Sequence, residues 1–186
     1  LNIQLVLDEP RAFTGFKARL VNFMNERNYL ALVGPECREL DGIVGYYGEQ
    51  LVLLAQSLGL NSCWVGGTYK VVNRAYNVDL GQKLAAVVAL GYGASQGVPH
   101  RSKAPQEVAP GYDGAPEWFK RGVDAALLAP TALNQQKFSF SLDGEENDVP
   151  VVRASTKRGA FTQMDLGIAQ CHFEIGAGNA LYRWAD

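Results

Sequence analysis

The segment from Ile43 to Leu58 constrains the fold most, because it is a long helix candidate with almost no polar stripe. Its middle, Leu51 to Leu54, is an unbroken apolar run. A helix that is apolar nearly all round is normally covered by other elements. We therefore expect this helix to lie deep in a core and to end at Gly59, which stands where a C-terminal helix glycine is usual. The chain of 186 residues is long enough to build such a core.

The remaining apolar segments follow either strand or helix periodicity. Strands are expected at 1–7, 29–33, 83–90, 137–142 and 151–154, with a further short strand that carries Trp64 and Val65. Helices are expected at 12–26, 117–128 and 165–183, the second with Trp118, Val123 and Leu127 facing inward. The acidic run DGEEND at 143–148 is interpreted as the turn of a hairpin, since it lacks the ligand spacing of a calcium loop.

Composition excludes several classes of function. The net charge is −2, with 17 basic against 19 acidic residues, which argues against a nucleic-acid binder with a basic face. No apolar run approaches the roughly 20 residues of a membrane span. Three scattered cysteines and two histidines do not form a metal or disulfide pattern. We expect a cytoplasmic protein that acts on small molecules and binds no metal.

A polar connection at 94–115, which contains Pro99, Pro105 and Pro110, is the best linker candidate in the chain. The helices on either side of it also share a spacing. Gly48 and Gly59 lie eleven residues apart, as do Gly167 and Gly178. Two matching glycines leave chance and an internal repeat equally open.

Reactive side chains are scarce. His172 is interpreted as a core histidine in an apolar helix, and His100 lies in a basic loop. Cys63 is interpreted as a small buried thiol, because no neighbour in sequence is cationic. A hydrolase that uses Cys63 or His172 stays open as an alternative. The chemistry is otherwise left to a cofactor.

Three segments suit cofactor binding. Gly66 and Gly67 follow the short strand and leave backbone N–H groups accessible, although an ordinary glycine turn explains them equally well. The segment from Leu127 to Phe138 places a hydroxyl and several amides after a helix, and taken alone it fits a capped loop better. Arg101 and Lys103 could hold a phosphate, although a solvated basic loop is the commoner explanation.

Taken in order, these segments resemble the FMN-dependent nitroreductase family, and most closely its compact two-repeat branch. The resemblance begins near Gly45, and the residues before it fit more loosely. It is carried by GYYGEQLVLLAQSLGLNSCWVGG (45–67), LGYGASQGVPHRSK (90–103), EWFKRGVDAALLAPTALNQQKF (117–138) and MDLGIAQCHFE (164–174).

The resemblance implies an α+β fold, a nitroreductase-like mixed sheet flanked by helices, in two related halves. The chain would form a single such domain, with halves at about 1–93 and 116–186 joined by the linker at about 94–115. It also implies a homodimer with FMN near the subunit interface.

The site residues that the resemblance implies all bind the cofactor. The flavin ring would be held by Pro130, Thr131, Ala132 and Asn134, and its face would be lined by Trp64, Val65, Gly66 and Gly67. Arg101 and Lys103 would reach the FMN phosphate. No side chain is expected to be catalytic in its own right, since the flavin carries the chemistry.

The chain also departs from the family pattern. The family usually begins with an Arg-Arg-Ser-x-Arg or Arg-His-Ser-x-Arg stretch that grips the phosphate, and no such stretch occurs here. Because the chain starts at Leu1 without methionine, we expect this N-terminal segment to be missing from the given sequence. Gln136, Lys137 and Phe138 stand where the family commonly has Gln-Pro-Trp, which leaves the substrate preference open.

The function that the resemblance implies is an FMN-dependent oxidoreductase with a ping-pong mechanism. NAD(P)H would reduce the flavin, and the flavin would pass the electrons to a nitroaromatic, a quinone or a similar small acceptor. The alternative is a non-catalytic flavin-binding or sensor protein of the same fold, which loss of the cationic stretch would favour.

Overall fold

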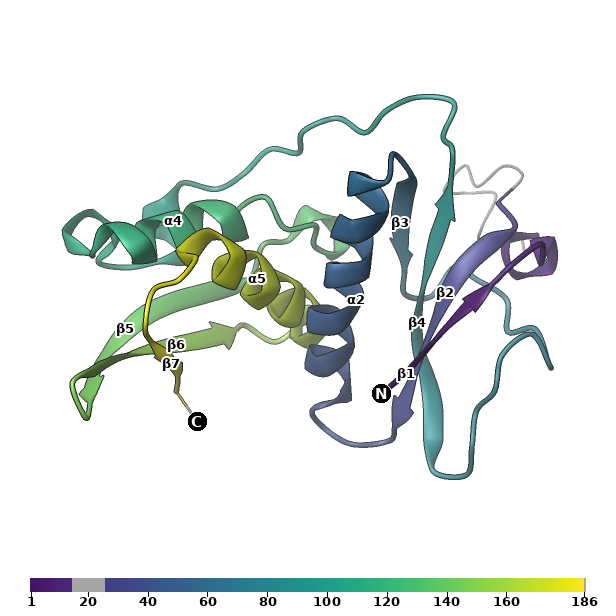
Figure 1. The fold of residues 1–186 in the computed structure, drawn as a ribbon, viewed down its shortest axis with the longest axis horizontal. Helices are drawn as coiled ribbons and strands as arrows, with labels where there is room; N and C mark the ends of the chain where they lie inside the picture. The colour runs from purple at the N-terminus through teal and green to yellow at the C-terminus, as the bar shows by residue number, and fades with distance from the viewer. Residues whose placement is uncertain (15–25, 186) are drawn as a thin grey trace. The chain divides into compact units, whose positions relative to one another are not determined.

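The computed structural model describes residues 1–14 and 26–185, and the chain divides into two units. The first unit comprises Leu1–Val44 and Gly48–Val98, and the second comprises Gly45–Tyr47 and Pro99–Asp186. Each unit contains its own sheet, with helices beside it (Figure 1). The predicted α+β class is thereby confirmed. The strands are divided between two sheets, whereas the sequence indicated one.

The sheet of the first unit has four strands in the order β1-β2-β4-β3, and all its neighbours pair antiparallel. Its apolar segments form strands because they combine β-branched and aliphatic residues without internal proline. The strands predicted at 1–7, 29–33 and 83–90 are confirmed with small shifts of their ends. Their bounds are β1 Asn2–Val6, β2 Asn28–Pro35, β3 Asn61–Val65 and β4 Gln82–Gly91.

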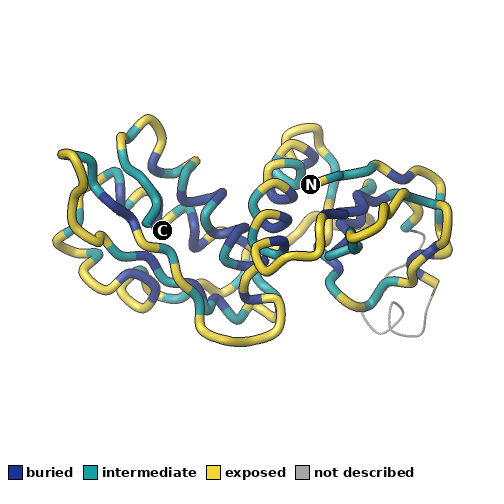
Figure 2. The backbone as a smooth tube through the Cα atoms, turned by 90° about the horizontal axis from the view of Figure 1, so that it is seen from below, coloured by how far each residue is buried: buried dark blue, intermediate teal, exposed yellow. Residues whose placement is uncertain are grey.

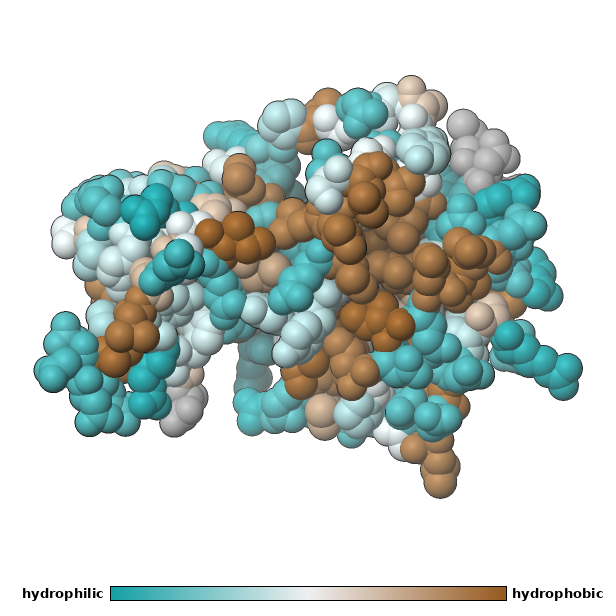
Figure 3. Space-filling model, in the orientation of Figure 1, coloured by the Kyte–Doolittle hydropathy of each residue, from teal (hydrophilic) through white to brown (hydrophobic). Residues whose placement is uncertain are grey.

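Helix α2 (Leu40–Ser57) lies against one face of this sheet (Figure 1). The expectation that it lies deep in the core is wrong. Leu54 is 52% exposed, and the apolar side chains of the visible face gather over α2 in Figure 3. A small residue makes the close contact with the sheet, because a Cβ at Gly48 would overlap the ring of Trp64. Leu54 lies on the exposed side of the helix. Gly59 follows the helix with φ +80, as predicted.

The other face of the sheet carries an aromatic core. Phe13 and Tyr29 meet edge to face at 5.6 Å between ring centroids, and Tyr29 meets Tyr76 in the same way at 6.4 Å. These rings pack with Val65 of β3, whose side chain is buried. The helix predicted at 12–26 is described only at its start, where a 3₁₀ helix η1 spans Pro10–Phe13. The rest of that prediction lies outside the described residues.

The second unit has a three-stranded sheet in the order β5-β6-β7, with β5 and β6 antiparallel and β6 and β7 parallel. The strands predicted at 137–142 and 151–154 are confirmed and are longer than expected. Their bounds are β5 Phe138–Glu146, β6 Val149–Thr156 and β7 Arg183–Trp184. The helices of this unit are α3 Pro105–Val108, η2 Tyr112–Gly114, α4 Glu117–Ala126, η3 Ala132–Asn134 and α5 Thr162–Ala177.

The acidic run at 143–148 is mostly strand, so its assignment as a six-residue turn is wrong. The turn consists of Asn147 and Asp148 alone, with φ 53 and φ 62. Two left-handed residues of these types form the type I′ turn that fits the twist of paired strands. Gly144, with φ +82, takes up the register shift between Leu142 and Glu145 as a bulge.

The last helix is shorter than the range 165–183 predicted from the sequence. Helix α5 ends at Ala177, and Gly178 follows with φ +66. The residues after it return to the sheet, where Arg183 pairs with Val151 in β6. This returning segment carries Tyr182 and Trp184, whose rings pack against Phe173.

An aromatic cluster fills the core of the second unit. Phe173 of α5 stacks on Phe140 of β5 with 4.8 Å between ring centroids. Trp118 stacks on Tyr182 with 5.2 Å between ring centroids. The prediction that Trp118 is an inward residue of α4 needs correction, because it is only half-buried and its neighbour Phe119 is the fully buried ring.

The chain between β4 and α3 is exposed from 92 to 99 (Figure 2). This stretch overlaps the start of the predicted linker at 94–115. The later part of that linker is folded, because α3 and η2 form there and Val108 is buried. Pro105 stands at the first turn of α3, where its missing N–H group is not needed.

We expect Gly176→Ala to lower the free energy of unfolding by about 1–3 kcal/mol, the usual range for overpacking. A Cβ at Gly176 would collide with the carbonyl oxygen of Arg121 and the side chain of Ala125, so α4 and α5 would have to separate. Urea unfolding followed by circular dichroism measures the change. Gly114→Ala is the control, since its Cβ would meet no heavy atom within 4 Å. Equal stability of the two variants would contradict the close helix contact.

Candidate functional site

Two of the predicted cofactor segments come together in the second unit. The first is the cationic segment, His100 to Lys103, which follows the exposed stretch. The second is the amide loop, Pro130 to Gln136, which begins after α4 because Pro130 prevents further helix and which contains η3. Ser102 donates a hydrogen bond to the carbonyl oxygen of Leu127 at 3.1 Å. The cationic segment is therefore attached to the end of α4, beside the amide loop.

Gln136 joins the two segments. Its side chain is buried, and its Oε1 accepts a hydrogen bond from the backbone N–H of Lys103 at 2.9 Å. Its Nε2 donates to the carbonyl oxygen of Arg101 at 2.9 Å and to Oδ1 of Asn134 at 2.7 Å. Its own carbonyl oxygen accepts from Nζ of Lys103 at 2.6 Å, and its N–H donates to Oγ1 of Thr131 at 3.1 Å. A single amide side chain thus fixes the relative position of Arg101, Lys103 and Asn134.

The predicted binding groups keep part of their hydrogen-bonding capacity. Asn134 donates one N–H to the carbonyl oxygen of Arg101 at 2.9 Å. Its Oδ1 accepts one hydrogen bond from Gln136. Because a side-chain amide has two N–H groups and two lone pairs, one of each remains after its hydrogen bonds with the described residues. Lys103 uses one of its three N–H bonds on Gln136, and Arg101 is exposed. Within the described residues, Nδ1 of His100 is buried and has no hydrogen-bond partner.

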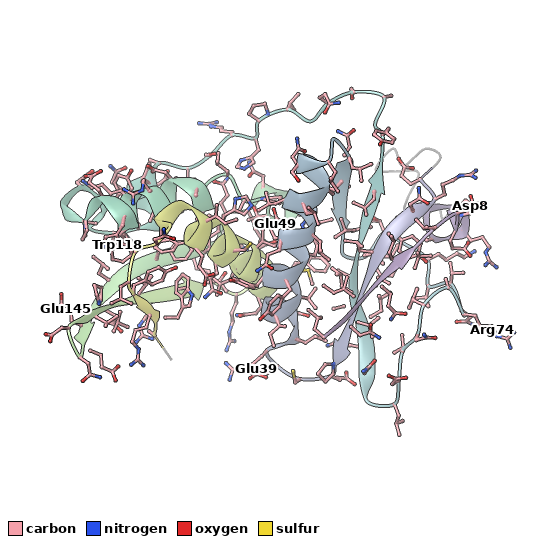
Figure 4. All side chains as sticks on the ribbon, in the orientation of Figure 1. Asp8, Glu39, Glu49, Arg74, Trp118 and Glu145 are labelled. Atoms are coloured by element: carbon pink, nitrogen blue, oxygen red, sulfur yellow. The ribbon has the colours of Figure 1, made fainter. Side chains whose placement is uncertain are left out.

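Trp64, Val65, Gly66 and Gly67 lie in the first unit, at the end of β3. Nε1 of Trp64 donates to the carboxylate of Glu49 at 2.8 Å, and Glu49 points from α2 toward β3 (Figure 4). The side chain of Val65 is buried in the core of that unit. The side chains of Trp64 and Val65 are therefore committed to packing, and the backbone at Gly66 and Gly67 is the part left to meet a ligand.

Two functional candidates were not identified from the sequence. Gln136 was noted only as part of a departure from the family pattern, and Asp165 was placed on a helix without a role. Asp165 is buried, and its carboxylate accepts hydrogen bonds from the N–H of Ala132 and from Nε2 of Gln135. A signal for Gln136 existed in the run of amides at 134–136. The role of Asp165 depends on a contact between distant segments, which spacing does not reveal.

Within the part of the chain that the structure describes, the remaining cysteine and histidine side chains do not form a second site. Cys63 is exposed, which corrects the expectation that it is buried. Surrounding protein still partly desolvates its sulfur, and this, together with the nearby Glu26, raises the pKa of the Cys63 thiol. The thiolate is therefore disfavoured. His172 is buried in α5, as predicted. Among the described residues, no cluster of three or more His, Cys, Asp or Glu side chains could hold a metal ion.

A helix that crosses a membrane must be both long and strongly apolar. Among residues 1–14 and 26–185, no helix meets both conditions.

Comparison with known proteins identifies one family. A family model described as "Putative TM nitroreductase" matches residues 1–177. Among solved structures, the chain is similar to a crystal structure described as a "putative nitroreductase" from Thermotoga maritima. The TM-score is 0.64 at 19% sequence identity, and the match covers 95% of this chain. The chain spans 65% of the length of that protein. No curated protein matches the chain.

Proposed function

Because the chain belongs to this nitroreductase family, we propose that it is an oxidoreductase that binds FMN and takes electrons from NAD(P)H. The acceptors would be nitroaromatics, quinones or similar small molecules, reduced in the second half of a ping-pong cycle. The network that Gln136 builds between the cationic segment and the amide loop carries this proposal. It brings cations for a phosphate and amides for a heteroaromatic ring into one rigid part of the second unit.

The residues present fit FMN by their chemistry. The phosphate is a dianion, and the exposed Arg101 with Lys103 would neutralise it through charge-assisted hydrogen bonds. Within the described residues, Nδ1 of His100 is buried and has no hydrogen-bond partner. It therefore offers a further polar contact next to Arg101. Asn134 has an N–H and a lone pair with which to meet the edge of the ring. Pro130, Thr131 and Ala132 would pack beside the ring through their backbone and small side chains.

When bound, FMN supplies hydride and electron transfer, for which protein side chains have no equivalent. The protein's own contribution would be to hold the ring, neutralise the phosphate and exclude competing reactions. The assignment of Trp64, Val65, Gly66 and Gly67 to flavin binding stays a prediction from the resemblance. A homodimer and a cytoplasmic location are also proposed. The exposed apolar residues Ile43, Leu54 and Leu58 of the α2 segment are the surface we favour for dimer formation.

The direct test is reconstitution with FMN followed by reduction. We expect the purified protein to bind FMN in a one-to-one ratio, and NADH or NADPH to bleach the bound flavin. Addition of a nitroaromatic or a quinone under anaerobic conditions should restore the yellow colour. Binding without bleaching would indicate the non-catalytic flavin-binding alternative, and absence of binding would overturn the proposal.

We expect Asn134→Ala to raise the dissociation constant for FMN about 5- to 30-fold, the equivalent of about 1–2 kcal/mol for hydrogen bonds to one amide. Fluorescence quenching of free FMN on binding measures this constant. Asn134 has φ 52, which alanine tolerates poorly and glycine tolerates well. Asn134→Gly is therefore the matched variant, since it removes the amide without backbone strain. If Asn134→Gly binds FMN as tightly as the wild type, the side chain does not contact the cofactor.

A further inference from the structure

The amide loop contains a left-handed turn that its sequence does not favour. Leu133 has φ 53 and ψ 26, and Asn134 has φ 52. Non-glycine residues adopt this region only occasionally, and leucine gains no local hydrogen bond there. Leu133 is also fully exposed, so burial of its side chain does not compensate for the strain. Two backbone hydrogen bonds close the turn, from Asn134 N–H to the carbonyl oxygen of Thr131 at 2.9 Å and from Gln135 N–H to that of Ala132 at 3.1 Å. Contacts from other segments add to these bonds in offsetting the strain at Leu133.

The carboxylate of Asp165 makes contacts on both sides of this turn. Its Oδ1 accepts a hydrogen bond from the N–H of Ala132 at 3.0 Å, directly before Leu133. Its Oδ2 accepts from Nε2 of Gln135 at 2.7 Å, directly after Asn134. The second N–H of the Gln135 amide donates to the carbonyl oxygen of Ala160 at 3.0 Å. One side chain on the first turn of α5 thus holds the two ends of the turn together.

Stability alone does not explain a carboxylate at this position. Asp165 is 4% exposed, and burial raises its pKa, although its hydrogen bonds and the nearby Lys137 act in the opposite direction. A carboxyl group whose pKa is higher in the folded than in the unfolded protein stabilises the fold only at low pH. That contribution is lost as the pH rises through the folded pKa. Loss of the Asp165 proton as the pH rises therefore lowers the folding stability relative to low pH, although both carboxylate oxygens accept hydrogen bonds from the loop.

We propose that Asp165 is a positioning residue, which holds the Leu133–Asn134 turn in the conformation that receives the flavin. This inference rests on the proposed binding of FMN. It assigns to Asp165 an effect on the cofactor through Ala132 and Gln135, without contact between the carboxylate and the cofactor.

The test compares Asp165→Asn with Gln135→Ala. Asparagine keeps an acceptor for the Ala132 N–H but presents an N–H to Gln135, so both variants remove the same hydrogen bond. We expect each to raise the dissociation constant for FMN about 5- to 20-fold, and the double variant to raise it no further. The visible spectrum of bound FMN should change in the same way in all three. Asp41→Asn, in the first turn of α2, controls for the loss of an acidic residue near a helix start.

Two further measurements separate positioning from a merely structural role. At a temperature where circular dichroism shows Asp165→Asn to be fully folded, its FMN binding should still be weaker than that of the wild type. Hydrogen exchange at the N–H of Ala132, measured without FMN, should accelerate in Asp165→Ala and not in Asp41→Asn.

The possible failures are distinguishable. If the wild-type protein does not bind FMN, the proposed function fails, and with it the effect of Asp165 on a cofactor, whatever the exchange at Ala132 shows. If the wild type binds FMN and Asp165→Asn binds it equally well with an unchanged spectrum, the positioning role of Asp165 is overturned while the proposed function stands. A loss of thermal stability that fully accounts for weaker FMN binding would also overturn it.

Discussion

Phe173→Ala should lower the free energy of unfolding by about 3–5 kcal/mol, the range measured for large aromatic residues removed from cores. The side chain of Phe173 is 0% exposed. Its ring stacks on Phe140 at 4.8 Å and meets the rings of Phe119 and Trp184 at 5.5 and 5.4 Å. The cavity left by alanine cannot close easily, because the surrounding rings come from three different elements. Whole domains have only about 5–15 kcal/mol of stability, so this loss is severe.

Urea unfolding of the variant can be followed by tryptophan fluorescence, since Trp118 and Trp184 belong to the affected cluster. Phe161→Ala is the matched control, because Phe161 is 41% exposed and lies outside the cluster. We expect that control to change stability by less than about 1 kcal/mol. A loss of stability below about 1.5 kcal/mol in Phe173→Ala would show that the neighbouring rings move into the cavity, which would contradict the expected effect.

Gln136→Leu should weaken FMN binding at least tenfold, about 1.4 kcal/mol, and should also destabilise the protein. Leucine fills a similar volume but makes none of the side-chain hydrogen bonds to Lys103, Arg101 and Asn134. Each polar group that is buried without a partner costs about 1–3 kcal/mol. The cationic segment would then separate from the amide loop. The side chains assigned to the phosphate and those assigned to the ring would no longer be held at a fixed distance from each other.

Calorimetric titration with FMN and urea unfolding give the two parts of this prediction independently. Gln106→Leu offers the same substitution at an exposed position of α3, where Nε2 donates a hydrogen bond to the carboxylate of Asp113. It should leave both quantities unchanged. If the Gln136→Leu protein is destabilised yet binds FMN normally, the hydrogen-bond network of Gln136 does not contribute to cofactor binding. The proposed function would then lose the observation on which it depends.

Local signals predicted most of the elements of the fold. Strand composition located β1, β2 and β4, and the apolar spacing located α2, α4 and α5. The errors occurred where packing between distant segments decided the outcome. The leucines of α2 suggested burial on all sides, but Gly48 makes the close contact with Trp64 and leaves Leu54 exposed. Tyr182 and Trp184 fit a continued helix in sequence, yet their rings pack onto Phe173 after the chain has turned at Gly178.

The candidate site was predictable only in part, for the same reason. The run of amides and the basic pair were visible in the sequence and drew attention to Asn134, Arg101 and Lys103. Their connection was not visible, because Gln136 reaches across more than thirty residues of chain to Lys103 and Arg101. Likewise, a buried aspartate on a helix has no sequence signature until the N–H of Ala132 is found against it.

The strand order of the first unit also determines when its sheet can form. Asn28 of β2 pairs with Leu90 of β4, and α2 and β3 lie between them in sequence. In the second unit, β5 and β6 are joined by a two-residue turn and pair locally. Since the chain entropy of closing a long loop slows folding, the β5–β6 hairpin can form early, and β2 can pair early with β1 on one side only. During synthesis, the other edge of β2 therefore stays unpaired until the ribosome has released β4, and in that interval its free backbone N–H and C=O groups can pair with another chain.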